Sequence, residues 1–267
     1  MKNYLLLCGG VGGAKLALGF SKILPQSHLT IAVNTGDDFS HLNLKICPDL
    51  DTVLYTLANE SDLSKGWGRS NETWEMHGAL EKLGGETWFQ LGDKDLATHI
   101  IRTQLLASGM NLSEVTQELC SRFGVNCNLL PMCHELVETY IQTKNRLLSF
   151  QEYFVKFKCE PPVTDFVFKG LDKAKFNPSI NLDLFDEVVI CPSNPFVSIN
   201  PIIQLNGIND FLKSNPHKVS VVSPIVNSKS LKGPTSKIMT ELGLEVSVNS
   251  IADFYKDFAR TIFVDSL

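Results

Sequence analysis

The sequence YLLLCGGVGGAK at residues 4–15 joins a short apolar run to a turn with four glycines in five positions. The run from Tyr4 to Cys8 predicts a buried β-strand, and residues 14–24 predict an α-helix directly after the turn. Such a turn lets backbone N–H groups approach an anion at the helix N-terminus. A tight turn without a ligand is the alternative, and the number of glycines favours phosphate binding.

Two familiar glycine motifs do not fit this turn. The dinucleotide fingerprint G-x-G-x-x-G would start at Gly10 and needs glycine or alanine where the chain has Lys15. A Walker A loop would need Gly-Lys-Ser/Thr at residues 14–16, where the chain has Ala-Lys-Leu. The turn therefore predicts phosphate binding without specifying NAD or ATP chemistry.

Four carboxylates follow the second predicted strand, at residues 29–33: Asp37, Asp38, Asp49 and Asp51. Clustered carboxylates repel one another unless a cation or a shared proton neutralises them, and magnesium usually takes one or two carboxylates together with substrate phosphates. The alternatives are a solvated acidic loop or a single ribose-binding acid at Asp37, as in dinucleotide enzymes. The surplus of acids favours a metal site or a general base. Asp38 is the weakest candidate, because adjacent side chains on extended backbone point opposite ways.

Apolar β-prone runs alternate with helical patterns along the chain, which is typical of an α/β protein. The strands read as continuous apolar runs, as expected for a mostly parallel sheet with helices on both faces. In the C-terminal half we expect strands at residues 187–191, 218–222, 245–248 and 261–264, and helices at residues 202–213, 236–242 and 251–258.

The middle of the chain has a different pattern. Helices are expected at residues 72–83, 95–106, 113–123 and 147–157, with Ser113 as an N-cap and Gly124 as a C-cap. We interpret residues 55–160, approximately, as a helix-rich insert or cap over the carboxyl ends of the strands. The whole chain, residues 1–267, is then one Rossmann-like α/β domain carrying this insert.

Composition restricts the class of protein further. The formal net charge of -5 offers no broad attraction to nucleic acid. The seven cysteines form no C-x-x-C pair, so we expect reduced core thiols, which fit the cytoplasm. No run approaches the roughly 18 apolar residues of a membrane span, and the start of the chain fails as a signal peptide. We expect no membrane partner, and a homodimer is the commonest assembly for such a protein.

Three further segments place polar residues just before expected helices: residues 90–99, 192–201 and 232–237. The first joins an expected strand to a helix. Each offers helix N-terminal amides to an anion, and each also fits ordinary turn chemistry. His99 fits a structural histidine as well as a catalytic one.

Together these segments resemble the 2-phospho-L-lactate transferase family of coenzyme F-420 biosynthesis. The resemblance runs in order from residue 4 to the C-terminus and includes residues 34–38, 47–57, 91–99, 193–201, 222–226 and 232–239. It implies a Rossmann-like core and transfer of a phospho-organic acid from its guanosine diphosphate ester to the deazaflavin Fo. GMP is released, and magnesium is the implied cofactor.

The resemblance also implies roles for particular residues. Catalysis and magnesium binding fall to Asp37, Asp49 and Asp51. Fo binding falls to Asp51, Lys94 and Thr98. Nucleotide and phosphate binding falls to Gly10, Gly12, Gly13, Lys15, Asn194, Ser198, Lys232 and Gly233. The three tryptophans offer aromatic faces for a deazaflavin ring, although we expect most of them in the core: Trp67, Trp74 and Trp88.

Two other functions remain open from the sequence. A non-catalytic nucleotide-sugar-binding regulator of the gluconeogenesis-factor type would share the glycine turn and the acidic strand end, but residues 47–57 and 91–99 favour the transferase. An NAD(P)-dependent dehydrogenase is disfavoured by Lys15 and by the surplus of acids.

Overall fold

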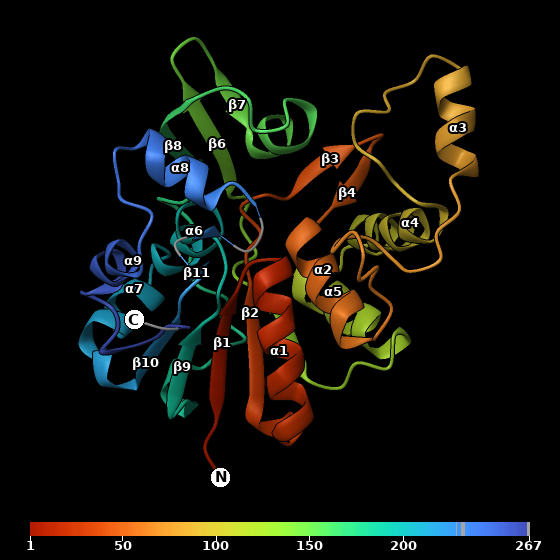
Figure 1. The fold of residues 1–267 in the computed structure, drawn as a ribbon. Helices are drawn as coiled ribbons and strands as arrows, with labels where there is room; N and C mark the ends of the chain where they lie inside the picture. Colours follow the sequence, from red (N-terminus) through yellow and green to blue (C-terminus); the bar gives the residue numbers. More distant parts are fainter. Residues whose placement is uncertain (228, 231–232, 266–267) are drawn as a thin grey trace.

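A six-stranded parallel sheet forms the centre of the computed structural model, which describes residues 1–227, 229–230 and 233–265 (Figure 1). The strand order is β13-β10-β9-β1-β2-β5. The strands are β1 Tyr4–Cys8, β2 Leu29–Val33, β5 Asn128–Pro131, β9 Glu187–Ile190, β10 Val219–Val222 and β13 Thr261–Phe263. The predicted α/β fold with a mostly parallel sheet is confirmed.

The strands β1, β2, β5, β9 and β10 supply side chains to two separate hydrophobic cores. On β1, Leu5 and Leu7 belong to one core, while Leu6 and Cys8 belong to the other. This division follows from the two-residue repeat of a strand, whose alternate side chains point to opposite faces. Both faces of the sheet are therefore covered, which explains the continuous apolar runs.

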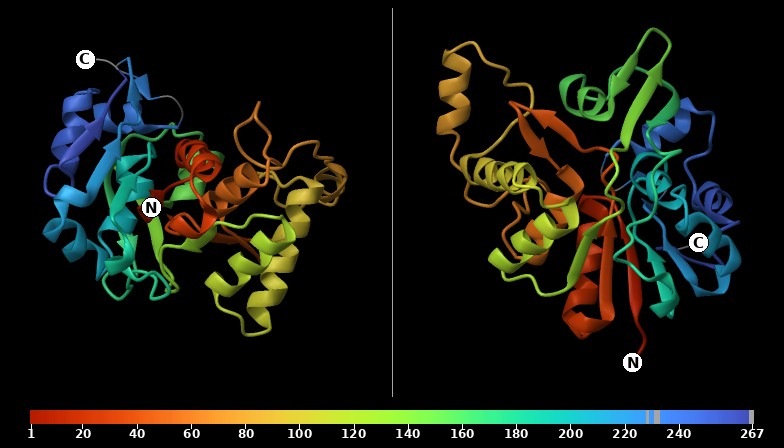
Figure 2. Two further views of the ribbon diagram at one scale, coloured as in Figure 1. Left: turned by 90° about the horizontal axis from the view of Figure 1, so that it is seen from below. Right: turned by 180° about the vertical axis from the view of Figure 1, so that it is seen from behind.

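Helices from different parts of the chain cover the two faces (Figures 1 and 2). One core contains residues of α1 Val11–Ile23, α2 Pro48–Leu57 and α5 Leu112–Arg122. The other contains residues of the C-terminal helical elements: η4 Pro195–Ile199, α6 Asn200–Ile203, α7 Ile208–Ser214, α8 Thr235–Glu241 and α9 Val248–Tyr255.

Several smaller elements stand beyond the carboxyl ends of β1 and β2 in Figure 1. They include the antiparallel hairpin β3 Phe39–His41 and β4 Leu44–Ile46, the helices α3 Glu75–Lys82 and α4 Asp93–Ala107, and a three-stranded sheet of β7 Leu147–Ser149, β6 Glu138–Thr143 and β8 Val163–Lys169. The remaining described elements are η1 Gln26–His28, η2 Glu152–Lys156, η3 Leu182–Leu184, η5 Pro216–Lys218, β11 Ile225–Val226 and β12 Lys229–Ser230.

The separate insert at about residues 55–160 stays a prediction, but this range contains strands that we did not predict. β5 lies within it and pairs with β2 at the edge of the central sheet. The range also contains β6 and β7. The expected helix at residues 147–157 is wrong: Leu147–Ser149 pairs with β6, and only the short helical turn η2 follows. The strand expected directly before α4 is also wrong, since residues 85–92 have no regular structure.

Two C-terminal predictions are also wrong. Residues 245–248 form no strand, because Ser247 caps α9 by accepting a hydrogen bond from the Ser250 N–H. Residues 202–213 form two helices rather than one, separated by Gly207 with φ +97°. Such a backbone angle is incompatible with a continuing α-helix.

For α5, the predicted N-cap is wrong and the predicted C-terminal glycine is confirmed. The N-cap is Asn111 rather than Ser113: the Asn111 side chain and Glu114 form a reciprocal capping box. Gly124 adopts φ +68° just after the helix, as predicted for its end.

All seven cysteines are free thiols, as predicted, and six of them are buried. Among the described helices, none combines the length and apolar character that a membrane span requires. The aromatic prediction is wrong, because none of the three tryptophans belongs to the buried core, and Trp67 is 41% exposed.

The close packing of the glycine turn leads to a stability prediction. A Cβ at Gly12 would lie 2.0 Å from the carbonyl oxygen of Pro192, a backbone atom that cannot rotate away. We expect Gly12→Ala to lose about 1–3 kcal/mol of unfolding free energy, as other overpacked sites do. Gly19→Ala in the same helix is the control, because nothing lies within 4 Å of its Cβ, and it should gain up to about 1 kcal/mol. Urea unfolding measures both, and equal stability of the two variants would contradict the prediction.

Candidate active site

The glycine turn packs against the loop that follows β9. The Gly9 N–H donates to Ser193 Oγ at 3.0 Å, and a Cβ at Gly9 would lie 2.5 Å from Ser198 Cβ. β1 and β9 are neighbours in the sheet, so their loops leave the same edge. This brings together five predicted nucleotide-binding residues: Gly10, Gly12, Gly13, Asn194 and Ser198.

Asn194 has one hydrogen-bonding group in use and one unsatisfied. Its Oδ1 accepts hydrogen bonds from the N–H groups of Phe196 and Val197, which caps η4. Its Nδ2 is buried and has no partner among the described residues. An unsatisfied buried donor beside the glycine turn fits a ligand oxygen.

The other predicted nucleotide residues are less closely placed. Lys15 lies on α1 and is exposed, one turn from the start of the helix. Gly233 is exposed with φ +74°. Lys232 lies outside the described residues.

Asp37 and Asp49 meet at the side chain of Asn34, which directly follows β2. Asn34 Nδ2 donates to Asp37 Oδ1 at 3.2 Å and to Asp49 Oδ2 at 3.0 Å, while Asn34 Oδ1 accepts the Gly36 N–H at 2.9 Å. Asp49 also lies against the glycine turn, since its Oδ1 would be 2.4 Å from a Cβ at Gly10. Two carboxylates thus converge on Asn34, and one of them, Asp49, reaches the N-terminus of α1.

The environment of this acid pair disfavours ionisation of both groups. Burial raises the pKa of Asp49 to about 7, the charge of Asp38 adds to the shift, and the Asn34 amide opposes it. Burial also raises the pKa of Asp37 well above its usual value, and the charges of Asp49 and Asp38 raise it further. A cation or a shared proton would relieve the repulsion between the two carboxylates.

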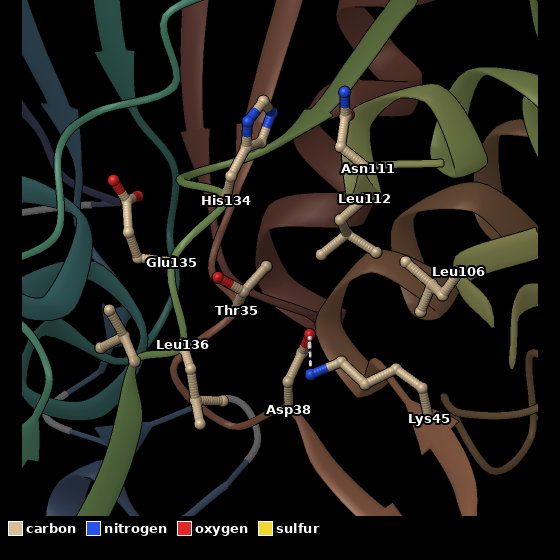
Figure 3. A pocket seen from close by; sticks show the side chains of 10 residues that line it. Thr35, Asp38, Lys45, Leu106, Asn111, Leu112, His134, Glu135 and Leu136 are labelled. Atoms are coloured by element: carbon tan, nitrogen blue, oxygen red, sulfur yellow. Dashed lines mark ion pairs between the residues drawn. The ribbon is translucent and has the colours of Figure 1, made fainter. Parts of the chain in front are cut away.

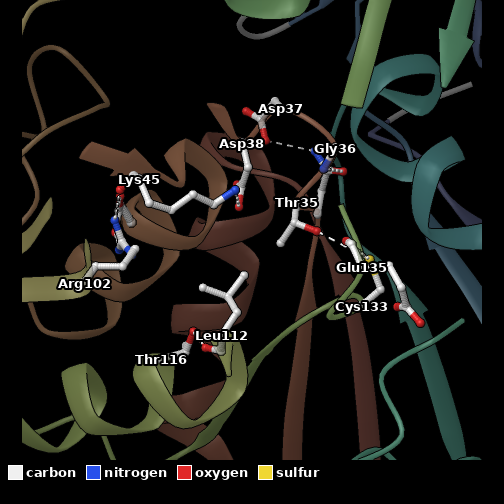
Figure 4. Close-up of polar contacts among 12 residues, drawn as sticks. Thr35, Gly36, Asp37, Asp38, Lys45, Arg102, Leu112, Thr116, Cys133 and Glu135 are labelled. Atoms are coloured by element: carbon white, nitrogen blue, oxygen red, sulfur yellow. Dashed lines mark hydrogen bonds and ion pairs between the residues drawn. The ribbon is translucent and has the colours of Figure 1, made fainter. Parts of the chain in front are cut away.

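Asp38 is directed away from this pair, toward Lys45 on β4 (Figure 4). Lys45 Nζ lies 3.1 Å from Asp38 Oδ2. Burial raises the pKa of Asp38, and Lys45 and the Cys47 thiol oppose the shift. Asp37 has Gln151 as its partner where Asp38 has Lys45: Gln151 Nε2 donates to Asp37 Oδ2 at 3.2 Å.

Asp51 forms a buried ion pair on the other side of α2. Both of its carboxylate oxygens accept hydrogen bonds from the guanidinium of Arg102, on α4. Arg102 Nη1 also donates to His99 Nδ1 at 3.0 Å, and His99 Nε2 lies 3.3 Å from Asp95. Residues two apart on a helix face different directions, so Asp49 and Asp51 take part in different clusters.

The two other predicted Fo ligands also lie on α4 and already have protein partners. Lys94 Nζ donates to the carbonyl oxygen of Ser70 at 3.1 Å. Thr98 is 4% exposed and lies near Tyr55. Tyr55 in turn donates to Asp95 Oδ1 at 2.7 Å, which extends the buried contacts between α2 and α4.

Several residues of this site were not predicted from the sequence. Ser193, Lys45, Gln151 and Arg102 all contact predicted site residues. A signal existed for Arg102: Asp95, His99 and Arg102 are spaced i, i+4, i+7 and therefore share one helix face.

Two converging carboxylates, rather than three, could hold a divalent cation at this site. Within the described residues, no group of three or more histidine, cysteine or acidic side chains is placed to hold a metal ion. Asp37 and Asp49 do converge, and magnesium usually needs only one or two carboxylates beside substrate phosphates and water. Asp51 is separate, since Arg102 occupies both of its oxygens.

Comparison with known protein families identifies the family of this chain. The family model described as 2-phospho-L-lactate transferase CofD matches residues 5–265. The chain belongs to the CofD family. As a member of this family it is a transferase enzyme.

Relatives with two different names match this CofD-family chain along almost all of its length. A 2-phospho-L-lactate transferase from Methanosarcina acetivorans is 40% identical, over 98% of this chain and 85% of the relative. A phosphoenolpyruvate transferase from Mycolicibacterium smegmatis is 38% identical, over 97% of this chain and 85% of the relative. A solved UPF0052 family protein from Bacillus halodurans shares the fold, with a TM-score of 0.67 at 15% identity, over 99% of this chain and 80% of that protein.

The Asp51–Arg102 pair allows a test of how this CofD-family site is held together. Arg102→Met would leave the Asp51 carboxylate buried without its partner, and we expect a loss of about 3–5 kcal/mol of unfolding free energy. Arg122→Met is the control, because its pair with Glu118 is exposed and contributes about 0–1 kcal/mol. Combining Arg102→Met with Asp51→Asn should restore part of the stability. Denaturant unfolding of all variants gives a double-mutant cycle, which measures the coupling free energy between Asp51 and Arg102. Additive losses from the two single substitutions would contradict the prediction.

Proposed function

We propose that this enzyme transfers a phospho-organic acid from its guanosine diphosphate ester to the deazaflavin Fo, with magnesium, and releases GMP. The acid pair Asp37–Asp49 beside the glycine turn is the observation that carries this proposal. It joins a site for diphosphate oxygens to carboxylates suited to magnesium. We place the reaction in the cytoplasm, which the seven free thiols support.

The identity of the organic acid stays open between related donors. The relatives at similar identity include 2-phospho-L-lactate transferases and phosphoenolpyruvate transferases. Lactyl, enolpyruvyl and glyceryl donors differ by small groups, which one or two side chains can discriminate. We therefore propose the donor class and leave its acid to direct measurement.

The nucleotide end of the donor would lie at the glycine turn and the loop after β9. Gly10, at the start of α1, has no side chain and no side-chain cap, so the first N–H groups of the helix are open to a phosphate oxygen. Asn194 Nδ2 is a further buried donor in need of an acceptor. We retain Lys15, Ser198, Lys232 and Gly233 as proposed contributors.

The reaction needs no protein nucleophile. The primary hydroxyl of the Fo ribityl tail would attack the phosphorus that bears the organic acid; a new O–P bond forms, and the P–O bond to GMP breaks. Asp37 or Asp49 would accept the proton of the attacking hydroxyl. When bound, magnesium supplies neutralisation of the diphosphate charge, and Asp37 and Asp49 are the residues that would hold it.

Asp51, Lys94 and Thr98 stay proposed contacts of Fo. Asp51 lies two residues from Asp49 on α2, so its anchor to Arg102 also orients the start of the helix that carries Asp49. Asp51 therefore has a proposed role at the Fo tail and a structural role in the α2–α4 contact.

The proposed reaction has a direct test. The purified protein is incubated with Fo, magnesium and the guanosine diphosphate ester of lactate, phosphoenolpyruvate or glycerate, each in turn. We expect GMP and a phosphorylated deazaflavin in equal amounts by mass spectrometry from at least one donor, and neither product when EDTA is present. If no donor yields both products, the proposed function is wrong.

The acid pair predicts a difference between neighbouring carboxylates in divalent-cation binding. Asp37→Asn and Asp49→Asn should each weaken Mn²⁺ binding at least tenfold by calorimetry, and should lower kcat by about 10²-fold or more. Asp51→Asn should keep Mn²⁺ and GDP binding, because its carboxylate faces Arg102, while losing most of kcat. Glu118→Gln on the exposed face of α5 controls for loss of one negative charge. Unchanged Mn²⁺ binding by Asp49→Asn would remove it from the metal site.

A further inference from the structure

Two of the four clustered acids are paired with a basic side chain. Lys45 Nζ lies 3.1 Å from Asp38 Oδ2, and Figure 3 shows the two side chains facing each other at one side of a pocket. The guanidinium of Arg102 donates to both carboxylate oxygens of Asp51. A positive charge at such a distance offsets the charge of the carboxylate, which then attracts a further cation less.

The two carboxylates of the acid pair receive their side-chain hydrogen bonds from neutral amides instead. Asp37 Oδ1 accepts from Asn34 Nδ2 and Asp37 Oδ2 accepts from Gln151 Nε2, each at 3.2 Å. Asp49 Oδ2 accepts from the same Asn34 amide at 3.0 Å. An amide N–H carries no net charge, and an ionised carboxylate has about four lone-pair sites. The amides therefore leave the charge of the pair, and part of its lone pairs, to a cation.

Gln151 reaches Asp37 from a distant part of the chain. It lies between β7 and η2, beside the three-stranded sheet, and is 4% exposed. The same sheet holds the loop of Asp37 a second time, because the Thr139 N–H of β6 donates to the carbonyl oxygen of Gly36 at 2.6 Å. The three-stranded sheet is thus attached to this loop through its main chain and through the side chain of Gln151.

We propose that Gln151 is a positioning residue for the divalent cation, because it fixes the direction of the Asp37 carboxylate without neutralising it. This inference rests on the proposed function, since the cation is the one that the transfer reaction uses. The χ2 torsion of an aspartate is soft, so a donor on each oxygen is needed to hold the plane of the carboxylate. Asn34 supplies one donor from the loop itself, and the three-stranded sheet supplies the other.

Removing the donor tests the positioning role. Gln151→Met keeps the approximate length of the side chain, and we expect Mn²⁺ binding by calorimetry to weaken about tenfold, as when other partners of metal ligands are lost. Excess Mg²⁺ should restore most of the transfer rate, because the ligands themselves remain. A purely structural role would give no such rescue. Gln142→Met is the matched control, since Gln142 donates only to the carbonyl oxygen of its neighbour Thr143 in the same sheet, and it should bind Mn²⁺ like the wild type.

Adding a charge tests the importance of a neutral donor. Gln151→Lys keeps a donor beside Asp37 but offsets the charge of the carboxylate, so we expect Mn²⁺ to bind about tenfold more weakly than in Gln151→Met. The Mg²⁺ concentration that restores Gln151→Met should leave Gln151→Lys impaired. Equal Mn²⁺ affinities of the two variants would show that neutrality is irrelevant. Urea unfolding checks the fold of each variant, and wild-type Mn²⁺ affinity in Gln151→Lys alone would also overturn the proposal.

The results keep this proposal apart from the transfer reaction. If both Gln151 variants bind Mn²⁺ like the wild type while the wild type releases GMP, the positioning role is wrong and the transferase function stands. If Mn²⁺ affinity depends on Gln151 but no donor yields GMP, the positioning role stands and the transfer reaction is wrong. A wild type that binds no Mn²⁺ would overturn the positioning role, because the acid pair would then hold no cation.

Discussion

The side chain of Asn34 organises the candidate site, because one amide group satisfies three partners. Its nitrogen donates to Asp37 and Asp49, and its oxygen accepts the Gly36 N–H. The main chain of Asn34 extends the hydrogen bonding between β2 and β1, because its N–H donates to the carbonyl oxygen of Cys8. This bond fixes Asn34 beside Cys8, the residue that precedes the glycine turn. The acid pair depends on this register, since a slip of one residue would turn Asn34 to the other face of the sheet.

Helix α2 directs its two acidic residues, Asp49 and Asp51, toward different neighbours. Pro48 begins the helix, so Asp49 and Asp51 both lie in its first turn and leave the axis in different directions. Asp49 faces the glycine turn, while Asp51 faces Arg102 and His99 on α4. The buried Asp51–Arg102 ion pair therefore positions α2 against α4, and the position of α2 sets the distance of Asp49 from Asn34.

Much of the fold could be predicted because the strands are buried on both faces. Continuous apolar runs identified β1, β2, β9, β10 and β13. The start of α1 was predicted at residue 14, after the glycine turn, but the helix begins at Val11 and includes two of the turn glycines. β5 was missed because its residues, Asn128–Pro131, follow a helical stretch and end in a proline, which is uncommon inside a sheet. Proline is tolerated here because β5 is the edge strand. The run at residues 147–157 was misread because its pairing with β6 is a tertiary contact that local periodicity does not contain.

Site residues were predictable where they follow a strand and unpredictable where they approach from another element. Asp37, Asp49 and Asn194 could be proposed from the sequence because each follows a strand or begins a helix at the carboxyl edge of the sheet. Lys45 and Arg102 were missed because a basic residue on a hairpin or a helix face is usually solvated. What distinguishes Arg102 is its burial, with the whole residue 2% exposed, and burial of a charge depends on how distant segments pack.

The balance of buried charge connects the stability of this site to its ligands. Asp37, Asp38 and Asp49 act on one another electrostatically, and Asp51 belongs to a separate cluster. Among the described residues, Lys45 pairs with Asp38 and Arg102 pairs with Asp51. Burial raises the pKa of Asp37, and the repulsion left between Asp37 and Asp49 raises it further, so the ligand-free site resists full ionisation. A bound cation would reverse this preference, because it interacts more strongly with the ionised pair than with the protonated pair. Cation binding and folding are then linked, since an ion that binds the native arrangement stabilises the fold as its concentration rises above its dissociation constant. The same acids that make the ligand-free site unfavourable thus favour its binding of a cation.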